Sequence, residues 1–397
     1  MENLLHRRQK TNRELLISDY GRNKLLTYAD TFRELSVFFP REEAGRARDK
    51  KELFEDMQIR ENIQVLSDNM KEVSRILSQI AAEVFTIRQL PPRTHKQVIR
   101  ALRQEKIVVQ DIFYYAQGTD ASKTALCLKG YAQNKRGYSI GELADMLSVL
   151  LNRRLVPSVM SGYRMEGEMA NFFFVEEPEY HVLTGNARAT KEGETISGDS
   201  FSVIEIDPGQ VVVLLSDGMG SGGKAGKESS QVVELMEYFL EAGYQLPAAL
   251  NLVNSSLLTA GTQKNMSTLD ICSLDLYSGV CEFRKAGGAT SYIKSGRFVE
   301  EVETKTLPLG IFGSVETESV KKELSAGDYV ILLTDGIRNA LVESGNEELL
   351  SCYISELQEK NPTQMARMIM QFAIHACGGR VEDDMLVVVV GIFAQSR

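Results

Sequence analysis

The sequence is poor in the residues that most often carry zinc-based or nucleophilic chemistry. It contains four histidines and five cysteines in 397 residues, no two cysteines form a CxxC pair, and no histidine stands close to a cluster of His, Cys or acidic residues. Zinc sites and histidine-activated nucleophiles are therefore disfavoured. An odd number of cysteines without paired spacing is typical of reduced thiols, so we expect a cytoplasmic protein.

The sequence also lacks a long apolar run. A membrane-spanning helix needs roughly 20 apolar residues, and the longest run here, Met385–Ala394, is about half that length and is interrupted by Gly391. Residues 1–22 are polar and charged and do not resemble a signal peptide. We therefore expect neither a transmembrane segment in this chain nor secretion.

The charge is unevenly distributed. The formal net charge is −9, which divides into +4 for residues 1–100 and −13 for residues 101–397. A strongly acidic body argues against binding to nucleic acid, whose phosphates require a broad basic surface. It favours a protein that gathers cations or that has a basic partner.

Residues 1–92 are expected to form a helical, coiled-coil-like regulatory segment. Eight apolar residues follow one another at alternating spacings of four and three: Ile59, Ile63, Leu66, Met70, Val73, Leu77, Ile80 and Val84. This pattern is the seam of a coiled coil or of a long helix docked on one partner. We favour a helix that pairs with a second copy or acts as a movable linker; the alternative is a helix packed on the core of its own domain. Pro91 and Pro92 end the run.

Residues 93–185 are predicted to form a small α/β unit. Residues 106–115 and 124–132 have the composition of strands, and Ser139 with Glu142 forms a capping box before an apolar helix. This part of the sequence shows no cluster of catalytic residue types, so we expect a regulatory or docking role for it.

Residues 186–397 are predicted to form a larger domain in which strands outnumber helices. Residues 201–206 and 211–218 form neighbouring strands, and helices are expected over 227–242 and 246–258. A last helix, near 363–376, has Asn361 as its candidate N-cap, with Pro362 following and Gly378 just past its end. The whole chain is thus α+β, and two layers of sheet flanked by helices account for the pattern in this domain.

Aspartates stand at the ends of the most apolar of these strands. Asp217 and Asp335 follow two buried strands in the tripeptides Ser-Asp-Gly and Thr-Asp-Gly, Asp383 and Asp384 directly precede the strand that starts at Met385, and Asp199 precedes the strand 201–206. Side chains at the ends of core strands are rigidly placed, so these carboxylates can converge at one end or along one edge of a sheet.

Several ionised carboxylates cannot share a site without a compensating cation. Ligation by oxygen alone favours Mg²⁺ or Mn²⁺, and two such ions about 3.5–4 Å apart can activate a water for in-line attack on phosphorus. The alternative is that each Asp-Gly pair is an ordinary turn. Its recurrence after two buried strands, with acids beside two others, favours a site for two metal ions.

The order of these motifs resembles the PPM (protein phosphatase 2C) family of metal-dependent Ser/Thr phosphatases. The segments GNARATKEGETISGDSF, SDGMGSG, STLDICSLDLYSG, FRKAGGATSYIKSG, LPLGIFG and GDYVILLTDG look like the branch of that family that acts in bacterial sporulation. The resemblance covers about 186–397, and the helical segment and the small α/β unit also look like the regulatory part of that branch. It implies an αββα sandwich, that is, two packed antiparallel sheets flanked by helices.

The resemblance also implies roles for individual residues. Asp217 would bridge two Mn²⁺ or Mg²⁺ ions, Gly218 would lend its carbonyl oxygen, Asp335 and Asp383 would complete the site, and Asp199 would ligate a metal or orient a water. Asp384 ranks below Asp383 as a ligand, and Thr268 and Asp270 have at most a supporting role. Arg188 and Lys191 lie near the expected position of a phosphate-binding arginine, but we interpret them as solvated surface charges.

The implied substrate is a phosphorylated anti-anti-sigma protein of the STAS type, with the N-terminal helix as the regulatory lever. Two alternatives stay open: a hydrolase of small phosphate esters that uses the same metals, and a catalytically silent scaffold that binds a phosphoprotein. The sporulation branch carries an N-terminal multi-span membrane region that this sequence does not contain. We therefore expect a soluble paralogue or a cytoplasmic portion, with membrane association through a partner or through a missing region.

Overall fold

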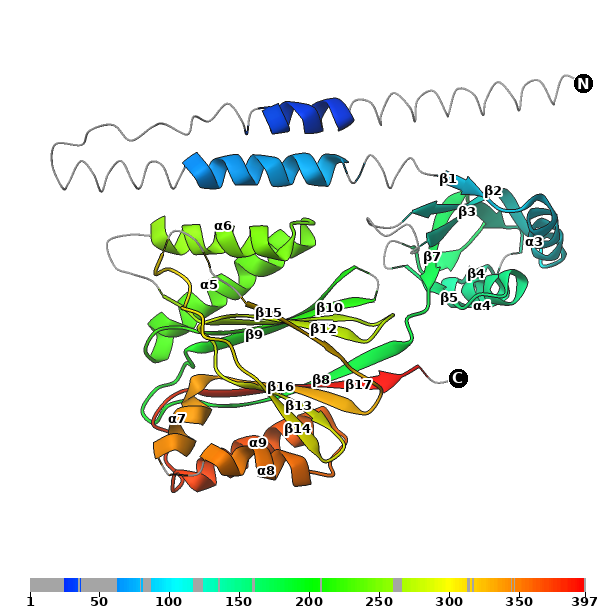
Figure 1. Cartoon of the computed structure of the whole chain (residues 1–397). Coiled ribbons are helices and arrows are strands. Elements are labelled where there is room, and N and C mark those ends of the chain that lie inside the picture. Colours follow the sequence, from blue (N-terminus) through cyan, green and yellow to red (C-terminus); the bar gives the residue numbers. More distant parts are fainter. Residues whose placement is uncertain are drawn as a thin grey trace, which may run out of the picture. The chain divides into compact units, whose positions relative to one another are not determined.

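A computed structural model describes residues 25–34, 36, 63–78, 80, 87–116, 124–134, 136–158, 161–207, 209–259, 266–312, 315, 318–343, 345 and 347–395. From residue 87 onward these residues form two compact units, which are divided between Glu177 and Pro178 (Figure 1). None of the helices among the described residues combines the length and the apolar character that crossing a membrane requires. All five cysteines are free thiols.

The described parts of the N-terminal segment are helical, over 25–34 and 63–78. The Ser67 hydroxyl donates a hydrogen bond of 2.8 Å to the Ser36 carbonyl and so links these two parts. Along the predicted apolar seam, Leu66 and Ile80 are 42% and 39% exposed, whereas the polar Glu72 is buried. The seam positions 59 and 84 lie outside the described residues.

The first unit is a five-stranded antiparallel sheet with two helices. The sheet has the order β1-β2-β3-β7-β5, formed by Ile87–Gln89, Ile107–Ala116, Thr124–Ala132, Ala170–Glu176 and Leu155–Pro157. The helices are α3 (Pro92–Gln104) and α4 (Ile140–Leu151), and the short strands β4 (Tyr138–Ser139) and β6 (Arg164–Met165) pair with each other. One core, which includes Leu102, Leu143 and Phe174, holds the sheet and the helices together.

Two details of this unit bear on the sequence predictions. The Ser139–Glu142 capping box at the start of α4 is confirmed, with both reciprocal hydrogen bonds present. Residues 87–89 form strand β1, whereas the sequence analysis assigned them to the helical segment. The physical reason is pairing, because β1 adds to the edge of the sheet beside β2.

The second unit contains two five-stranded antiparallel sheets. The first sheet has the order β15-β12-β11-β10-β9, formed by Glu318–Glu323, Val280–Ala286, Leu269–Asp275, Gln210–Asp217 and Asp199–Asp207. The second has the order β14-β13-β16-β17-β8, formed by Phe298–Val302, Ser291–Ser295, Asp328–Leu333, Met385–Ala394 and Tyr180–Ala189.

Helices cover the outer face of each sheet, which gives the predicted αββα sandwich (Figure 1). The helices α5 (Gly222–Glu241) and α6 (Leu246–Thr259) pack on the first sheet, and α7 (Asp335–Glu343), α8 (Glu347–Glu356) and α9 (Pro362–Ala376) pack on the second. A third apolar layer between the sheets includes Val213, Phe283 and Val388. The predicted fold class is confirmed.

The second unit begins at Pro178, whereas the sequence predicted a boundary between residues 185 and 186. The difference arises from β8, whose residues pair along their whole length with β17, from Tyr180 opposite Ala394 to Ala189 opposite Met385. Through this pairing β8 belongs to the sandwich, as the edge strand of its second sheet, and not to the preceding unit.

The start of α9 agrees with the sequence prediction and gives a test of the fold. The Asn361 side chain accepts hydrogen bonds from the backbone amides of Thr363 and Gln364, and Pro362 occupies the first helical position. We expect Asn361→Ala to lower the free energy of unfolding by about 1 kcal/mol, because two helix-end amides lose their acceptor. Urea unfolding measures the change. Asn361→Ser, which keeps a capping oxygen, is the control, and an equal loss in both variants would contradict the capping role.

Candidate metal centre

The predicted aspartates gather at one end of the sandwich. Asp199 opens β9 and lies directly opposite Asp217, the last residue of β10. On the other sheet, Asp335 begins α7 two residues after the end of β16, and Asp383 stands two residues before the start of β17, the neighbour of β16. Strand pairing within each sheet, together with the packing of the two sheets, therefore brings together residues that are far apart in the chain.

Thr334 connects the two sheets at this end. Its hydroxyl donates a hydrogen bond of 2.9 Å to Oδ2 of Asp199 and accepts one of 2.8 Å from the backbone amide of Leu386 in β17. The side chain of Asp199 is buried, and its second oxygen, Oδ1, has no hydrogen-bond partner. One oxygen of Asp199 is thus fixed by the second sheet, and the other is left without a donor.

Burial and the neighbouring carboxylates shift the pKa values of these aspartates in the same direction. Burial raises the pKa of Asp217, and the Asp199 charge and the contact with Asp335 raise it further. Burial also raises the pKa of Asp199, against the hydrogen bond from Thr334, and the charges of Asp384 and Asp335 add to the rise. Asp383 follows the same direction, because burial raises its pKa and the Asp335 charge contributes. The site therefore carries more negative charge than its surroundings stabilise.

The adjacent aspartates 383 and 384 have different environments. Both oxygens of Asp384 are engaged by backbone amides, at 2.9 Å from Lys191 and 2.7 Å from Gly198, and its side chain is buried. Asp383 is half-buried and accepts only the amide of Asp384 among the described hydrogen bonds. Asp384 therefore fastens the segment before β9 to β17, which leaves Asp383 as the better candidate ligand.

Gly218 must be glycine because helix α5 lies against it. A Cβ at this position would lie 2.2 Å from the carbonyl oxygen of Ala225 in the second turn of the helix. The sequence predicted the start of this helix near residue 227, but it starts at Gly222, since the glycine-rich loop continues into a helix that packs closely on the end of β10. The backbone of Gly218 is correspondingly held in place, and its amide donates to the Gly198 carbonyl.

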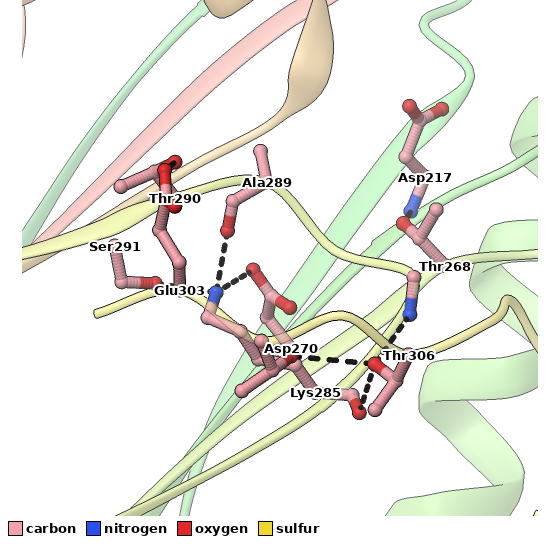
Figure 2. A network of polar contacts seen from close by, with 11 residues as sticks. Asp217, Thr268, Asp270, Lys285, Ala289, Thr290, Ser291, Glu303 and Thr306 are labelled. Atoms are coloured by element: carbon pink, nitrogen blue, oxygen red, sulfur yellow. Dashed lines mark hydrogen bonds and ion pairs between the residues drawn. The ribbon is translucent and has the colours of Figure 1, made fainter. Parts of the chain in front are cut away.

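The backbone of Asp217 is held by β11 and the residues before it. The amide of Thr268 donates to the Asp217 carbonyl at 2.9 Å, and the Ser267 hydroxyl donates to the same oxygen at 2.7 Å. In return the Asp217 amide donates to the Thr268 hydroxyl at 3.2 Å (Figure 2). Three hydrogen bonds thus fix the residue predicted to bridge the metals.

The donor set fits a hard divalent cation. In the described part of the chain, no three His, Cys, Asp or Glu side chains already lie in the arrangement of a metal site. The site does contain carboxyl groups with raised pKa values. One buried oxygen among them, Oδ1 of Asp199, has no hydrogen-bond partner. Such a group is stabilised by a cation with a preference for oxygen, which is the chemistry of Mg²⁺ and Mn²⁺.

Sequence reasoning missed the residues that hold the carboxylates. Thr334 and Ser267 lie inside motifs that were recognised, but nothing in their local sequence indicates which atoms they bind. Arg188 is exposed, as expected of a surface charge, and Lys191 contributes its backbone amide to Asp384.

Comparison with known proteins adds independent information. Residues 207–393 match the model of the family described as stage II sporulation protein E (SpoIIE). Stage II sporulation protein E of Bacillus subtilis (strain 168) is 30% identical over 337 residues, which are 84% of this chain and 40% of that protein. The chain therefore spans less than half the length of this curated relative. A shorter match, 37% identical over 65 residues, covers 16% of this chain and 32% of the phosphoserine phosphatase RsbX of the same organism.

A solved structure of the PP2C phosphatase domain of Bacillus subtilis SpoIIE, with a fragment of its regulatory domain, is similar to this chain. The similarity has a TM-score of 0.64 at 29% sequence identity and covers 89% of this chain and 98% of that chain. The sandwich and the unit before it thus occur together in a protein of known structure.

The excess negative charge gives a test that does not depend on activity. We expect Asp217→Asn to raise the free energy of unfolding in the presence of a chelator by about 1 kcal/mol, or ~2–4 °C in melting temperature, because one of several crowded carboxylates becomes neutral. Adding Mn²⁺ should stabilise the wild type and not the variant. Thermal unfolding with and without Mn²⁺ measures both effects, and Glu192→Gln, an exposed acid of the same unit, is the control. A variant that melts below the wild type in chelator would show that the carboxylates do not repel one another.

Proposed function

Because the chain belongs to the stage II sporulation protein E family of PP2C-type phosphatases, we propose that it removes phosphate from phosphoserine or phosphothreonine in a protein substrate, with Mn²⁺ or Mg²⁺ as cofactor. Within this proposal, residues 186–397 are the catalytic domain, and residues 1–92 and 93–185 are regulatory. The proposed place of action is the cytoplasm.

One observation carries the proposal: aspartates from both sheets meet at one end of the sandwich, where one of their buried oxygens has no partner. Asp199, Asp217 and Asp335 contribute mutually interacting side chains, and Asp383 interacts with Asp335. Asp199, Asp217, Gly218, Asp335 and Asp383 are the residues that would hold two ions. Bound in such a site, a pair of ions activates water for in-line attack on phosphorus.

The protein's own residues supply rigidity. Thr334 fixes one oxygen of Asp199, and Ser267 and Thr268 fix the backbone of Asp217. Pre-organised groups lower the barrier because they need no rearrangement when the charge at phosphorus develops. Within this proposal the chain positions ions and water, and no phosphoenzyme is formed.

The proposed substrate is a phosphorylated STAS-type anti-anti-sigma protein. Two findings support this choice: the family is named for sporulation, and one relative, RsbX, is named as a phosphoserine phosphatase. A hydrolase of small phosphate esters would use the same ions, and a silent scaffold would bind the phosphoprotein without turnover. The presence of every expected aspartate at one end of the sandwich favours an active enzyme over the scaffold.

The test is the release of phosphate from a phosphorylated STAS-domain protein. We expect release that requires Mn²⁺ or Mg²⁺ and stops in chelator, and a loss of at least about 100-fold in Asp335→Asn, because a ligand that acts in the reaction is removed. Circular dichroism should show that the variant keeps its fold. Glu192→Gln serves as the matched surface control. Faster turnover of p-nitrophenyl phosphate or a nucleotide than of the phosphoprotein would favour the small-ester alternative, and binding without turnover in the wild type would favour the scaffold.

We also propose that the helix over 63–78 pairs with a second copy of the chain. The supporting observation is the exposure of Leu66 and Ile80, two apolar residues of the predicted seam. We expect Leu66→Glu to shift the protein from dimer to monomer, because a charge in an apolar seam is costly to bury. Sedimentation measures the mass, and Lys71→Glu, an exposed position of the same helix, is the control. A wild-type protein that is already monomeric at micromolar concentration would contradict the pairing.

A further inference from the structure

Lys285, in β12, is one of the most deeply buried side chains of the molecule, with 1% of its surface exposed. Its ammonium group donates three hydrogen bonds, of 2.7 Å to Oδ2 of Asp270, 2.5 Å to the Ala289 carbonyl and 2.7 Å to the Ser291 hydroxyl (Figure 2). All three donors of the ammonium are therefore used, which is what a buried lysine requires.

The turn that follows Lys285 is built around Asp270. A Cβ at Gly288 would lie 1.6 Å from Oδ1 of Asp270, so only glycine allows the chain to pass this carboxylate. Asp270 is itself buried, and its Oδ1 has no hydrogen-bond partner. Burial raises the pKa of Asp270 to about 6, and the Lys285 charge opposes the rise. The pair is thus fully enclosed, with 2.7 Å between the ammonium nitrogen and Oδ2 of the carboxyl group.

This pair joins both sheets at the end where the aspartates gather. Asp270 belongs to β11 and Lys285 to β12 of the first sheet, whereas Ser291 is the first residue of β13 in the second sheet. The ammonium therefore ties the start of β13 to the start of β11. Two positions before Asp270 stands Thr268, which lies beside Asp217 (Figure 2). Its amide donates to the Asp217 carbonyl, and its hydroxyl accepts from the Asp217 amide.

A second route connects the pair with Asp217. The Thr306 hydroxyl donates to the Lys285 carbonyl at 2.8 Å, which holds the segment that leads to Leu309. Leu309 and Ser267 exchange backbone hydrogen bonds, of 2.9 and 3.4 Å. The Ser267 hydroxyl then reaches the Asp217 carbonyl. The two routes end on the same peptide group.

We propose that Lys285 and Asp270 are positioning residues that hold Ser267 and Thr268, and through them the backbone of Asp217, in the geometry that metal binding requires. The inference rests on the proposed function, since it concerns the same metal centre. Stability alone does not explain the pair, because a buried ion pair can often be replaced by uncharged residues without loss of stability. Both residues are enclosed, with 2% and 1% of their surfaces exposed, so they act through the residues that they hold.

The experiment separates stability from metal affinity in the full chain. The double variant Asp270→Asn/Lys285→Met removes both charges, and Lys285→Met alone leaves a buried carboxylate without its cation. Urea unfolding reports stability, and the Mn²⁺ concentration at the midpoint of the rise in melting temperature reports metal affinity without any substrate. Lys294→Met is the matched control, because Lys294 is also buried, in β13, but donates to the carbonyls of Gly296 and Ser355 at the other end of that strand.

We expect the double variant to unfold at nearly the wild-type urea concentration but to need about tenfold more Mn²⁺, the usual effect of losing a residue that orients metal ligands. The single variant should unfold at less urea. Lys294→Met should leave the Mn²⁺ midpoint unchanged. An unchanged midpoint in a folded double variant, or an equal shift in Lys294→Met, would overturn the positioning role.

Ser267→Ala keeps the inference testable if the double variant does not fold. It leaves the ion pair intact and removes one of the three hydrogen bonds to the Asp217 backbone, the final link of the second route, so its Mn²⁺ midpoint should also rise. An unchanged midpoint would overturn the inference. The wild type separates the two proposals. No Mn²⁺-induced rise in its melting temperature would overturn both, whereas a rise with the same Mn²⁺ midpoint in every variant would overturn only the positioning role.

Discussion

Mutual repulsion among buried carboxylates is the constraint on which the rest of this structure depends. Asp199 and Asp217 face each other across β9 and β10, and burial together with the neighbouring aspartates keeps the pKa of each high. A fold that only had to be stable would not place these side chains together, because each adds a desolvation cost and a like-charge cost. The sandwich tolerates the arrangement because apolar layers on both faces of each sheet stabilise it elsewhere.

The surroundings of the carboxylates show how the cost is limited to one region. Hydrogen bonds from Thr334 to Asp199, and from Ser267 and Thr268 to the backbone of Asp217, fix these two aspartates. Both oxygens of Asp384 accept hydrogen bonds from backbone amides. Among these aspartates, Asp199 keeps a buried oxygen, Oδ1, that has no hydrogen-bond donor. The arrangement thus restrains the ligands without using up their coordinating oxygens, which is the condition for binding an ion tightly.

The sequence predicted the sandwich and the identity of the clustered acids because both depend on local patterns. Strands such as 211–215 and 385–390 are continuous apolar runs, and Asp-Gly after a buried strand is visible in one line of sequence. Strand β15 was missed because four of its six residues are charged, which is typical of an exposed edge strand. The start of α5 was missed because glycine argues against helix, whereas Gly226 within the helix lies against the Ser197 carbonyl, which a Cβ would approach to 2.5 Å.

Partners that lie far apart in the sequence were beyond prediction, and the two buried lysines show why. Lys285 and Lys294 are both on or next to strands of ordinary amphipathic pattern, and no local signal distinguishes them from exposed lysines. In the folded chain Lys294 binds carbonyls alone, whereas Lys285 meets a carboxylate fifteen residues away in sequence and directly beside the residues that hold Asp217. A buried cation placed next to a cluster of anions, yet paired with a separate aspartate, cannot neutralise that cluster. It therefore leaves the negative charge of the metal centre available to a bound ion while it fixes the strands that carry it.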